Sequence, residues 1–153
     1  MLKPHRKYND GTNIQFYMNE VAERGVIVVY DTSLTGTPTL DDVNNAVKLP
    51  TAGYTGEAPA GLLLCDVVDY DPSTCYPNYH KREVPVTGKV EILRKGTVVT
   101  NMLDTGLTIV PGEDAYYITA GVLTNVVAGY KVGTFMSPID DDGYVQVDIT
   151  IGS

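Results

Sequence analysis

Two stretches of this chain alternate between apolar and polar residues, and this alternation constrains the fold more than any other feature. Residues 82–92 and residues 144–151 both follow a period of two. That period is typical of a half-buried β-strand, whose successive side chains point to opposite faces. Pro85 has no amide hydrogen, so we expect an edge position or a bulge there. We expect the following residues to face inward: Val84, Val86, Val90, Ile92, Val145, Val147, Ile149 and Ile151.

Other apolar runs in the chain are short and are separated mostly by Gly, Pro, Asn or Asp. The segment 39–47 is ambiguous, because a short helix and a loop leading into a strand explain its pattern equally well. The further strand candidates are residues 14–18, 26–30, 46–49, 62–68, 97–100, 107–110, 115–119, 122–126 and 130–136. Many short strands with glycine between them predict a barrel or a sandwich.

The length of 153 residues suits one compact domain. We therefore predict an all-β fold, in which a single small β-barrel or sandwich domain carries an extended N-terminal arm and long loops. The simplest division places the arm at residues 1–20 and the β-barrel domain at residues 21–153. A frayed terminus explains the first residues as well as a functional arm does.

The formal net charge of -8 is unevenly distributed along the chain. Cations crowd the first seven residues, whereas Asp140, Asp141 and Asp142 crowd a late turn. Proteins that bind nucleic acids rely on Lys and Arg to neutralise phosphates, so we expect a protein partner and no nucleic acid. We also expect no membrane partner and no secretory signal, because apolar runs of the required length are missing from the sequence.

Two long loops stand out, at residues 32–38 and 71–78. Tyr70, Tyr76 and Tyr79 flank or join the second, which also contains two prolines. Tyrosine is enriched at protein interfaces, because it adds contact area at a low entropic cost. Tyrosines that cover the open end of a barrel with their hydroxyls in water are an equally good explanation.

Cys65 is the residue that most resembles a reactive group. A nucleophilic cysteine needs a base, and His80 is the only credible one in the chain. The apolar neighbours of Cys65 instead favour a core strand with a structural thiol. Asp66 alternates to the opposite face, so the two do not form a pair. With Cys75 as the only other cysteine, we expect two thiols and no disulfide framework.

Other chemical sites find no support in the sequence. No zinc-ligand spacing and no glycine-rich phosphate loop occur. The segment 140–143, Asp-Asp-Asp-Gly, predicts a hairpin turn rather than a calcium site. Asp66, Asp69 and Asp71 are acids of the kind that protect a strand edge. We expect no metal, no cofactor and no enzymatic activity.

Five segments, taken in order, resemble the head decoration (capsid cement) proteins of tailed bacteriophages. The resemblance spans about residues 23–151 as a pattern of strands and turns, although the loops at 32–38 and 70–81 are longer than in the plainest members. The segments are ERGVIVVYDTS (23–33), APAGLLLCDVVD (58–69), VPVTGKVEILRKG (84–96), PGEDAYYITAGVLTN (111–125) and YKVGTFMSPIDDDGYVQVDI (130–149).

The resemblance implies a β-barrel protein without a catalytic site, located on the outer surface of the virion capsid. It implies a homotrimer whose partner is the major capsid protein, and an arm that reaches over the capsid or over a neighbouring subunit. The expected contacts are Lys3, His5, Arg6, Lys7 and Tyr8 in the arm, and Tyr76, Tyr79, His80, Lys81 and Arg82 in the loop.

Two other functions compete with capsid binding. In a glycan-binding β-domain, exposed tyrosines stack on sugar rings and the Asp140–Asp142 cluster binds calcium, although the sequence contains no tryptophan. In a small hydrolase, Cys65 or the group of Asp66, Asp69 and Asp71 carries the chemistry. Native thiol labelling separates the hydrolase from the other two, because a buried structural thiol reacts slowly.

Overall fold

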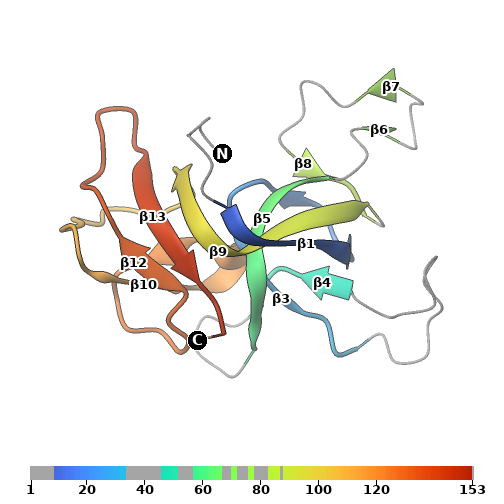
Figure 1. The fold of residues 1–153 in the computed structure, drawn as a ribbon, viewed down its shortest axis with the longest axis horizontal. Coiled ribbons are helices and arrows are strands. Elements are labelled where there is room, and N and C mark those ends of the chain that lie inside the picture. The colour runs from blue at the N-terminus through green and yellow to red at the C-terminus, as the bar shows by residue number, and fades with distance from the viewer. Residues whose placement is uncertain are drawn as a thin grey trace.

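The computed structural model describes residues 9–33, 46–51, 57–66, 70–71, 76–77, 83–86 and 88–152. Almost all of its regular structure is β (Figure 1). The strands are β1 (Asn9–Met18), β2 (Ala22–Glu23), β3 (Ile27–Tyr30), β4 (Ala46–Lys48), β5 (Pro59–Asp66), β6 (Tyr70–Asp71), β7 (Tyr76–Pro77), β8 (Glu83–Val84), β9 (Lys89–Thr100), β10 (Asp114–Tyr117), β11 (Leu123–Thr124), β12 (Gly133–Phe135) and β13 (Val145–Thr150). A 3₁₀ turn, η1 (Thr119–Gly121), lies between β10 and β11. The predicted all-β class is confirmed.

Five strands close into a barrel in the order β1-β4-β3-β5-β9, and an antiparallel pairing of β1 with β9 completes the ring. The β1–β4 pair is parallel, and the other pairs of the ring are antiparallel. Closure pairs each of the five strands on both sides and so leaves the ring without an open edge. The predicted barrel is therefore present, and β1, which begins at Asn9, is one of its strands. The division between arm and domain at residue 20 stays a prediction.

The second half of β9 leaves the barrel and starts a second layer in the order β9-β13-β12-β10-β11. β5 pairs with β9 up to Leu93, and β13 pairs with it from Lys95 to Thr100. Figure 1 shows this layer, with β10, β12 and β13, to one side of the barrel strands β1, β3 and β4. One long strand thus joins the two layers.

Two apolar cores follow from this arrangement. The inside of the barrel holds Phe16, Met18, Val28, Val47, Ala60, Leu63, Val84, Val90 and Ile92, among others. The second core lies between the outer side of β3, β5 and β9 and the second layer; it includes Ile27, Leu62, Leu93, Tyr117, Leu123, Phe135, Val145, Val147 and Ile149. Strands that are buried on both faces have near-continuous apolar sequences, as in residues 26–29 and 60–64.

The prediction of separate strands at residues 82–92 and 97–100 is wrong. A turn at Pro85–Gly88, closed by the Gly88 amide donating to the Pro85 carbonyl at 3.1 Å, separates β8 from β9. β9 then continues through Arg94 and Lys95, where the sequence indicated a break. Gly96, with φ 144°, allows the strand to change direction without ending.

Four other predictions can be compared with the described residues. Residues 107–110 form no strand, because this segment is a loop in which Ile109 alone is buried. Ala46 and Val47 belong to β4, while the rest of the ambiguous segment 39–47 lies outside the described residues. The alternation is confirmed along β13, where buried and half-buried residues alternate, but Tyr144, on the outward parity just before it, is buried. Val86, predicted to face inward, is instead exposed. Within the described ranges, no helix is long and apolar enough to span a membrane.

Candidate functional site

The residues predicted to contact the capsid fall mostly outside the described residues. This holds for Lys3, His5, Arg6, Lys7 and Tyr8 in the arm, and for Tyr79, His80, Lys81 and Arg82 in the loop. Tyr76 lies in β7, opposite Asp71 of β6, so the proline-containing loop includes a short two-stranded ribbon. Figure 1 shows this ribbon on the other side of the molecule from β10 and β12. The contact roles of these residues stay predictions.

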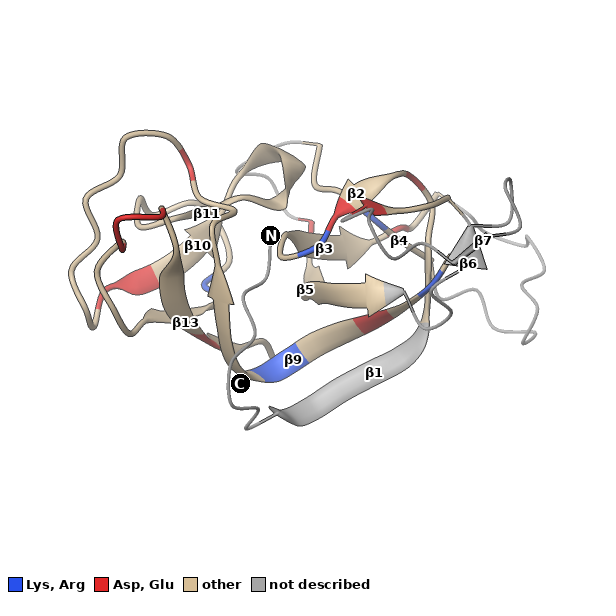
Figure 2. Cartoon of the chain, turned by 90° about the horizontal axis from the view of Figure 1, so that it is seen from above, with Lys and Arg blue, Asp and Glu red and all other residues tan. Residues whose placement is uncertain are grey.

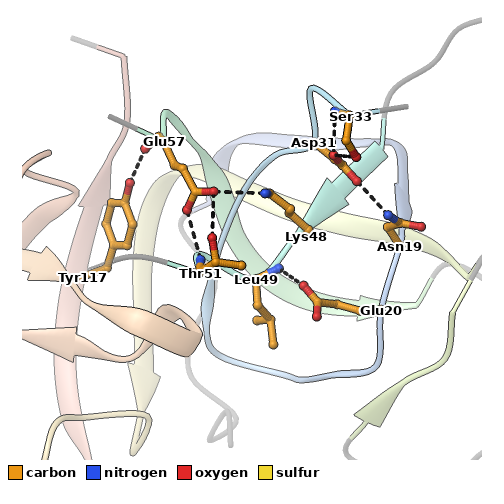
Figure 3. Close-up of polar contacts among 9 residues, drawn as sticks. All are labelled: Asn19, Glu20, Asp31, Ser33, Lys48, Leu49, Thr51, Glu57 and Tyr117. Carbon is orange, nitrogen blue, oxygen red and sulfur yellow. Dashed lines mark hydrogen bonds and ion pairs between the residues drawn. The ribbon is translucent and has the colours of Figure 1, made fainter. Parts of the chain in front are cut away.

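A polar network occupies the end of the barrel formed by β3 and β4 (Figure 3). Asp31 is only 8 % exposed and accepts three hydrogen bonds, from Asn19 Nδ2 at 2.7 Å, the Ser33 amide at 2.9 Å and Ser33 Oγ at 2.6 Å. Burial of Asp31 disfavours its charged form, but these bonds outweigh that effect and lower the pKa of the carboxyl. The network therefore fixes the chain where β3 ends.

Glu57 forms a second polar contact beside the first. Its carboxylate lies 3.0 Å from Lys48 Nζ and accepts hydrogen bonds from the amide and the hydroxyl of Thr51, at 3.0 and 3.3 Å. Desolvation opposes its ionisation, but Lys48 and Thr51 outweigh it, so the pKa of Glu57 is lowered. The bond to Glu57 in turn raises the pKa of Lys48. These contacts hold residues 51 and 57 together, at the two ends of the segment 52–56.

Two further bonds tie this end of the barrel to its neighbours. Glu20 Oε1 accepts the Leu49 amide at 2.6 Å, and the Tyr117 hydroxyl of the second layer donates to the Glu57 carbonyl. Burial, together with the nearby charge of Glu57, raises the pKa of Tyr117 to about 12. Because these polar groups already have protein partners, the network acts as a structural clamp at the ends of loops.

Cys65 lies in β5, as predicted, and is half-buried. Its thiol donates a 3.5 Å hydrogen bond to Glu91 Oε2, on the residue directly opposite in β9. His80, the only base that the sequence offered, is outside the described residues. The contact made by Cys65 is therefore one between neighbouring strands of the barrel wall.

The segment 140–143 forms the predicted turn between β12 and β13. The amides of Asp142 and Tyr144 both donate to Asp140 Oδ1, at 3.1 and 2.6 Å, and Gly143 adopts φ 81°. The Asp140 carboxylate is thus part of the turn itself. Across the described part of the chain, no three His, Cys, Asp or Glu side chains are grouped so that they could hold a metal ion.

A surface that the sequence analysis missed lies at the far end of the second layer. Val110, Val126, Val127 and Met136 are large apolar side chains, and each is more than half exposed. The sequence placed Val110 and Val126 in strands at 107–110 and 122–126. In the structure β11 ends at Thr124, and Val126 and Val127 lie in the loop that follows it. An apolar side chain in the sequence does not show whether the sheet ends before it.

Two comparisons of the sequence with known proteins find no match. The sequence matches no protein-family model, and a search of curated proteins finds no significant match.

Proposed function

We propose that this chain is a head decoration protein, which binds the outer surface of a tailed-phage capsid and cements neighbouring major capsid protein subunits against internal DNA pressure. One observation carries the proposal: the five segments of the resemblance coincide with strands, in the same order. They contain β3, β5, the end of β8 with most of β9, β10 with β11, and β12 with most of β13. The barrel expected from the resemblance is formed by three of these strands together with β1 and β4.

The architecture suits a protein that acts as a clamp. A closed barrel and a second layer share β9, so the surfaces at the two ends of the molecule are joined by continuous strand structure. Cementing requires many modest contacts at fixed positions, and the repetition of those contacts around a shell multiplies their effect. In the proposal, the protein is a homotrimer that sits on the outer face of the virion.

The proposed contacts come from the two segments identified in the sequence. Lys3, His5, Arg6 and Lys7 pair with acidic groups on the capsid, and Tyr8 adds apolar area. In the loop, contact with the capsid removes water from Tyr76 and Tyr79, and His80, Lys81 and Arg82 contribute charge. Charge pairs at such an interface speed association and make it sensitive to salt.

Sedimentation of the purified protein with expanded empty capsids tests this proposal. We expect binding that saturates at a fixed ratio, together with a trimer mass by light scattering of the free protein. The arm is tested by deleting residues 1–8, which leaves β1 intact because that strand begins at Asn9. The deletion should weaken binding roughly tenfold at low salt and less at high salt.

The results that contradict the proposal differ for its two parts. A monomer that leaves capsids bare overturns the decoration function, and glycan-array binding that disappears with a chelator would put a glycan-binding domain in its place. If the deletion variant binds capsids as tightly as the intact chain, the arm is not a contact, although the decoration function stands.

A further inference from the structure

Four exposed apolar residues of the second layer, Val110, Val126, Val127 and Met136, lie in segments close to Glu113, and we call this group the Glu113 corner. The exposed fractions are 74 % for Val127, 56 % for Val110, 54 % for Val126 and 51 % for Met136. Single exposed apolar residues are common, but a group of them on one surface often marks an interaction site. The question is whether these four lie together and what would cover them.

Hydrogen bonds bring the three segments of the corner together at Glu113. Its carboxylate accepts the Val110 amide and Asn125 Nδ2, both at 3.0 Å, and Asn125 Nδ2 also donates to the Thr108 carbonyl at 3.0 Å. Asn125 directly precedes Val126, so the loop with Val126 and Val127 is fixed beside Val110.

Met136 reaches the same corner through the backbone of the sheet. The Phe135 amide donates to the Glu113 carbonyl at 2.8 Å, and the Gly112 amide donates to the Phe135 carbonyl at 2.7 Å. Met136 follows Phe135 directly. Val110 begins a tight turn that ends at Glu113, and the Glu113 amide donates to the Val110 carbonyl at 3.2 Å. The four apolar residues are thus held by one bonded framework.

The stretch of chain that contains the corner is acidic. Residues 101–144 contain six acids, Asp104, Glu113, Asp114, Asp140, Asp141 and Asp142, and a single cation, Lys131. Lys131 lies 2.7 Å from Asp114, so its charge is largely compensated. In Figure 2 several red segments lie at the end of the molecule formed by β10, β11 and β13, and others lie on β2 and β9. Hydrogen bonds from the Val110 amide and Asn125 lower the pKa of Glu113, which keeps this carboxylate charged.

Charge decides between the possible occupants of this surface. If the corners of two copies met face to face, their carboxylates would oppose one another, and like charges across an interface are unfavourable. A partner surface that combines apolar side chains with Lys or Arg satisfies both features at once. The apolar groups would cover the valines and Met136, and the cations would lie near the surrounding acids.

We propose that the Glu113 corner docks a cationic, apolar segment of the major capsid protein. The identity of that partner rests on the proposed function, whereas the chemistry of the segment rests on the corner alone. The corner lies at the opposite end of the molecule from β6 and β7, so a second contact there would let one subunit touch two sites of the capsid (Figure 1). Two contacts at fixed separation strengthen binding through their effective concentration.

Methyl NMR of the intact chain tests the chemistry without a capsid. The probe is a short synthetic peptide of alternating leucine and lysine, and a leucine–glutamate peptide is the control. We expect saturable shifts of the Val110, Val126, Val127 and Met136 methyls with the lysine peptide only. The double variant Val126→Ser/Val127→Ser should bind it about tenfold more weakly, because two apolar side chains are lost. Val21→Ser, at an exposed valine beside β2, is the matched control and should have no effect.

Two NMR results and one light-scattering result would overturn the inference. If the lysine peptide causes no methyl shifts, the corner does not dock it. If the double variant binds the peptide as tightly as the wild type, binding depends on charge alone and not on Val126 and Val127, and the corner is not a docking surface. Light scattering that finds a dimer dissociated by the double variant would make a second copy the occupant.

Sedimentation with capsids then tests the partner. The double variant and the charge variant Asp141→Lys/Asp142→Lys should each bind capsids about tenfold more weakly than the wild type. If the wild type binds and both variants bind equally well, the corner does not face the capsid. If the wild type itself leaves capsids bare, the decoration function fails, and the peptide measurement alone decides whether the corner docks cationic apolar segments.

Discussion

The barrel and the second layer of this protein are built from the same kind of strand but end in different ways. In the barrel, the pairing of β1 with β9 closes the ring, so that its strands are paired on both sides. The second layer finishes in β10, β11 and β12, which are two to four residues long, and its glycine-rich connections leave valines exposed. Closure provides rigidity, whereas an open sheet with short final strands leaves room for a contact surface.

The two regions nevertheless depend on one another. β3, β5 and β9 carry side chains of both cores, and consecutive residues point into different ones, as Ile92 and Leu93 do on β9. We therefore expect the regions to unfold together. The following predictions test that expectation, from the largest effect to the smallest.

Truncation of the two neighbours on β9 tests whether the cores are coupled. Ile92→Ala opens a cavity in the barrel, and Leu93→Ala opens one in the second core; both residues are fully buried. Each should lower the free energy of unfolding by roughly 2–5 kcal/mol. Urea unfolding, followed by circular dichroism and by tyrosine fluorescence, should show one coincident transition for both variants. Separate transitions would mean that the layers are independent.

Gly121 tests the place where the second layer rests on β3. A Cβ at this position would lie 2.1 Å from the Ile27 carbonyl oxygen, and φ is +74°. Gly121→Ala should therefore destabilise the protein by about 3 kcal/mol. The control is Gly112→Ala, where φ is +96° and a Cβ would have nothing within 4 Å. Only the backbone conformation is strained there, so the expected destabilisation is about 1 kcal/mol. Equal melting temperatures for the two variants would contradict this close approach.

Thr100 tests a polar link between the regions. Its buried hydroxyl donates to the Gly25 carbonyl at 3.3 Å and accepts the Met102 amide at 3.1 Å. Thr100→Val keeps the shape but leaves both backbone groups without this partner, so we expect a loss of about 1–3 kcal/mol in chemical denaturation. Thr100→Ser keeps the hydroxyl and should lose less. A valine variant as stable as the wild type would show that the link is unimportant.

Acid should loosen the clamp at the end of the barrel before it affects the core. Asp31 and Glu57 have lowered pKa values, so their stabilisation is complete above the ordinary values of 3.8 and 4.5 and is lost as pH falls through the lowered values. The melting temperature should therefore decrease at pH values below about 4, and Glu57→Gln should make this decrease with pH smaller. Thr51→Ser, which keeps the hydroxyl, is the control. An unchanged acid slope in the glutamine variant would exclude this role of Glu57.

The sequence predicted those parts of the fold that depend on local alternation. β13 was found because one face of it is buried and the other is partly exposed, which preserves the period of two. The Asp140 turn was found because aspartate and glycine favour that backbone geometry. The pairing of β1 with β9, which closes the barrel, joins segments about eighty residues apart and leaves no local pattern.

The failures of prediction have physical causes as well. The sequence indicated a break between residues 92 and 97, but a glycine with positive φ, here Gly96, also lets a strand bend and continue. Val110 and Val126 looked like strand residues, because an apolar side chain carries no local sign of whether the tertiary structure covers it. The contacts of Asp31 and Glu57 join polar residues from separate segments and could not be distinguished from ordinary surface charges.

Cryo-electron microscopy of expanded empty capsids incubated with the protein tests the central claim most directly. The account predicts additional density on the outer surface at local threefold positions. The barrel and second layer should fit that density, with the Glu113 corner against the major capsid protein. Capsids that remain bare when the protein is in large molar excess over the binding sites would contradict the proposed function.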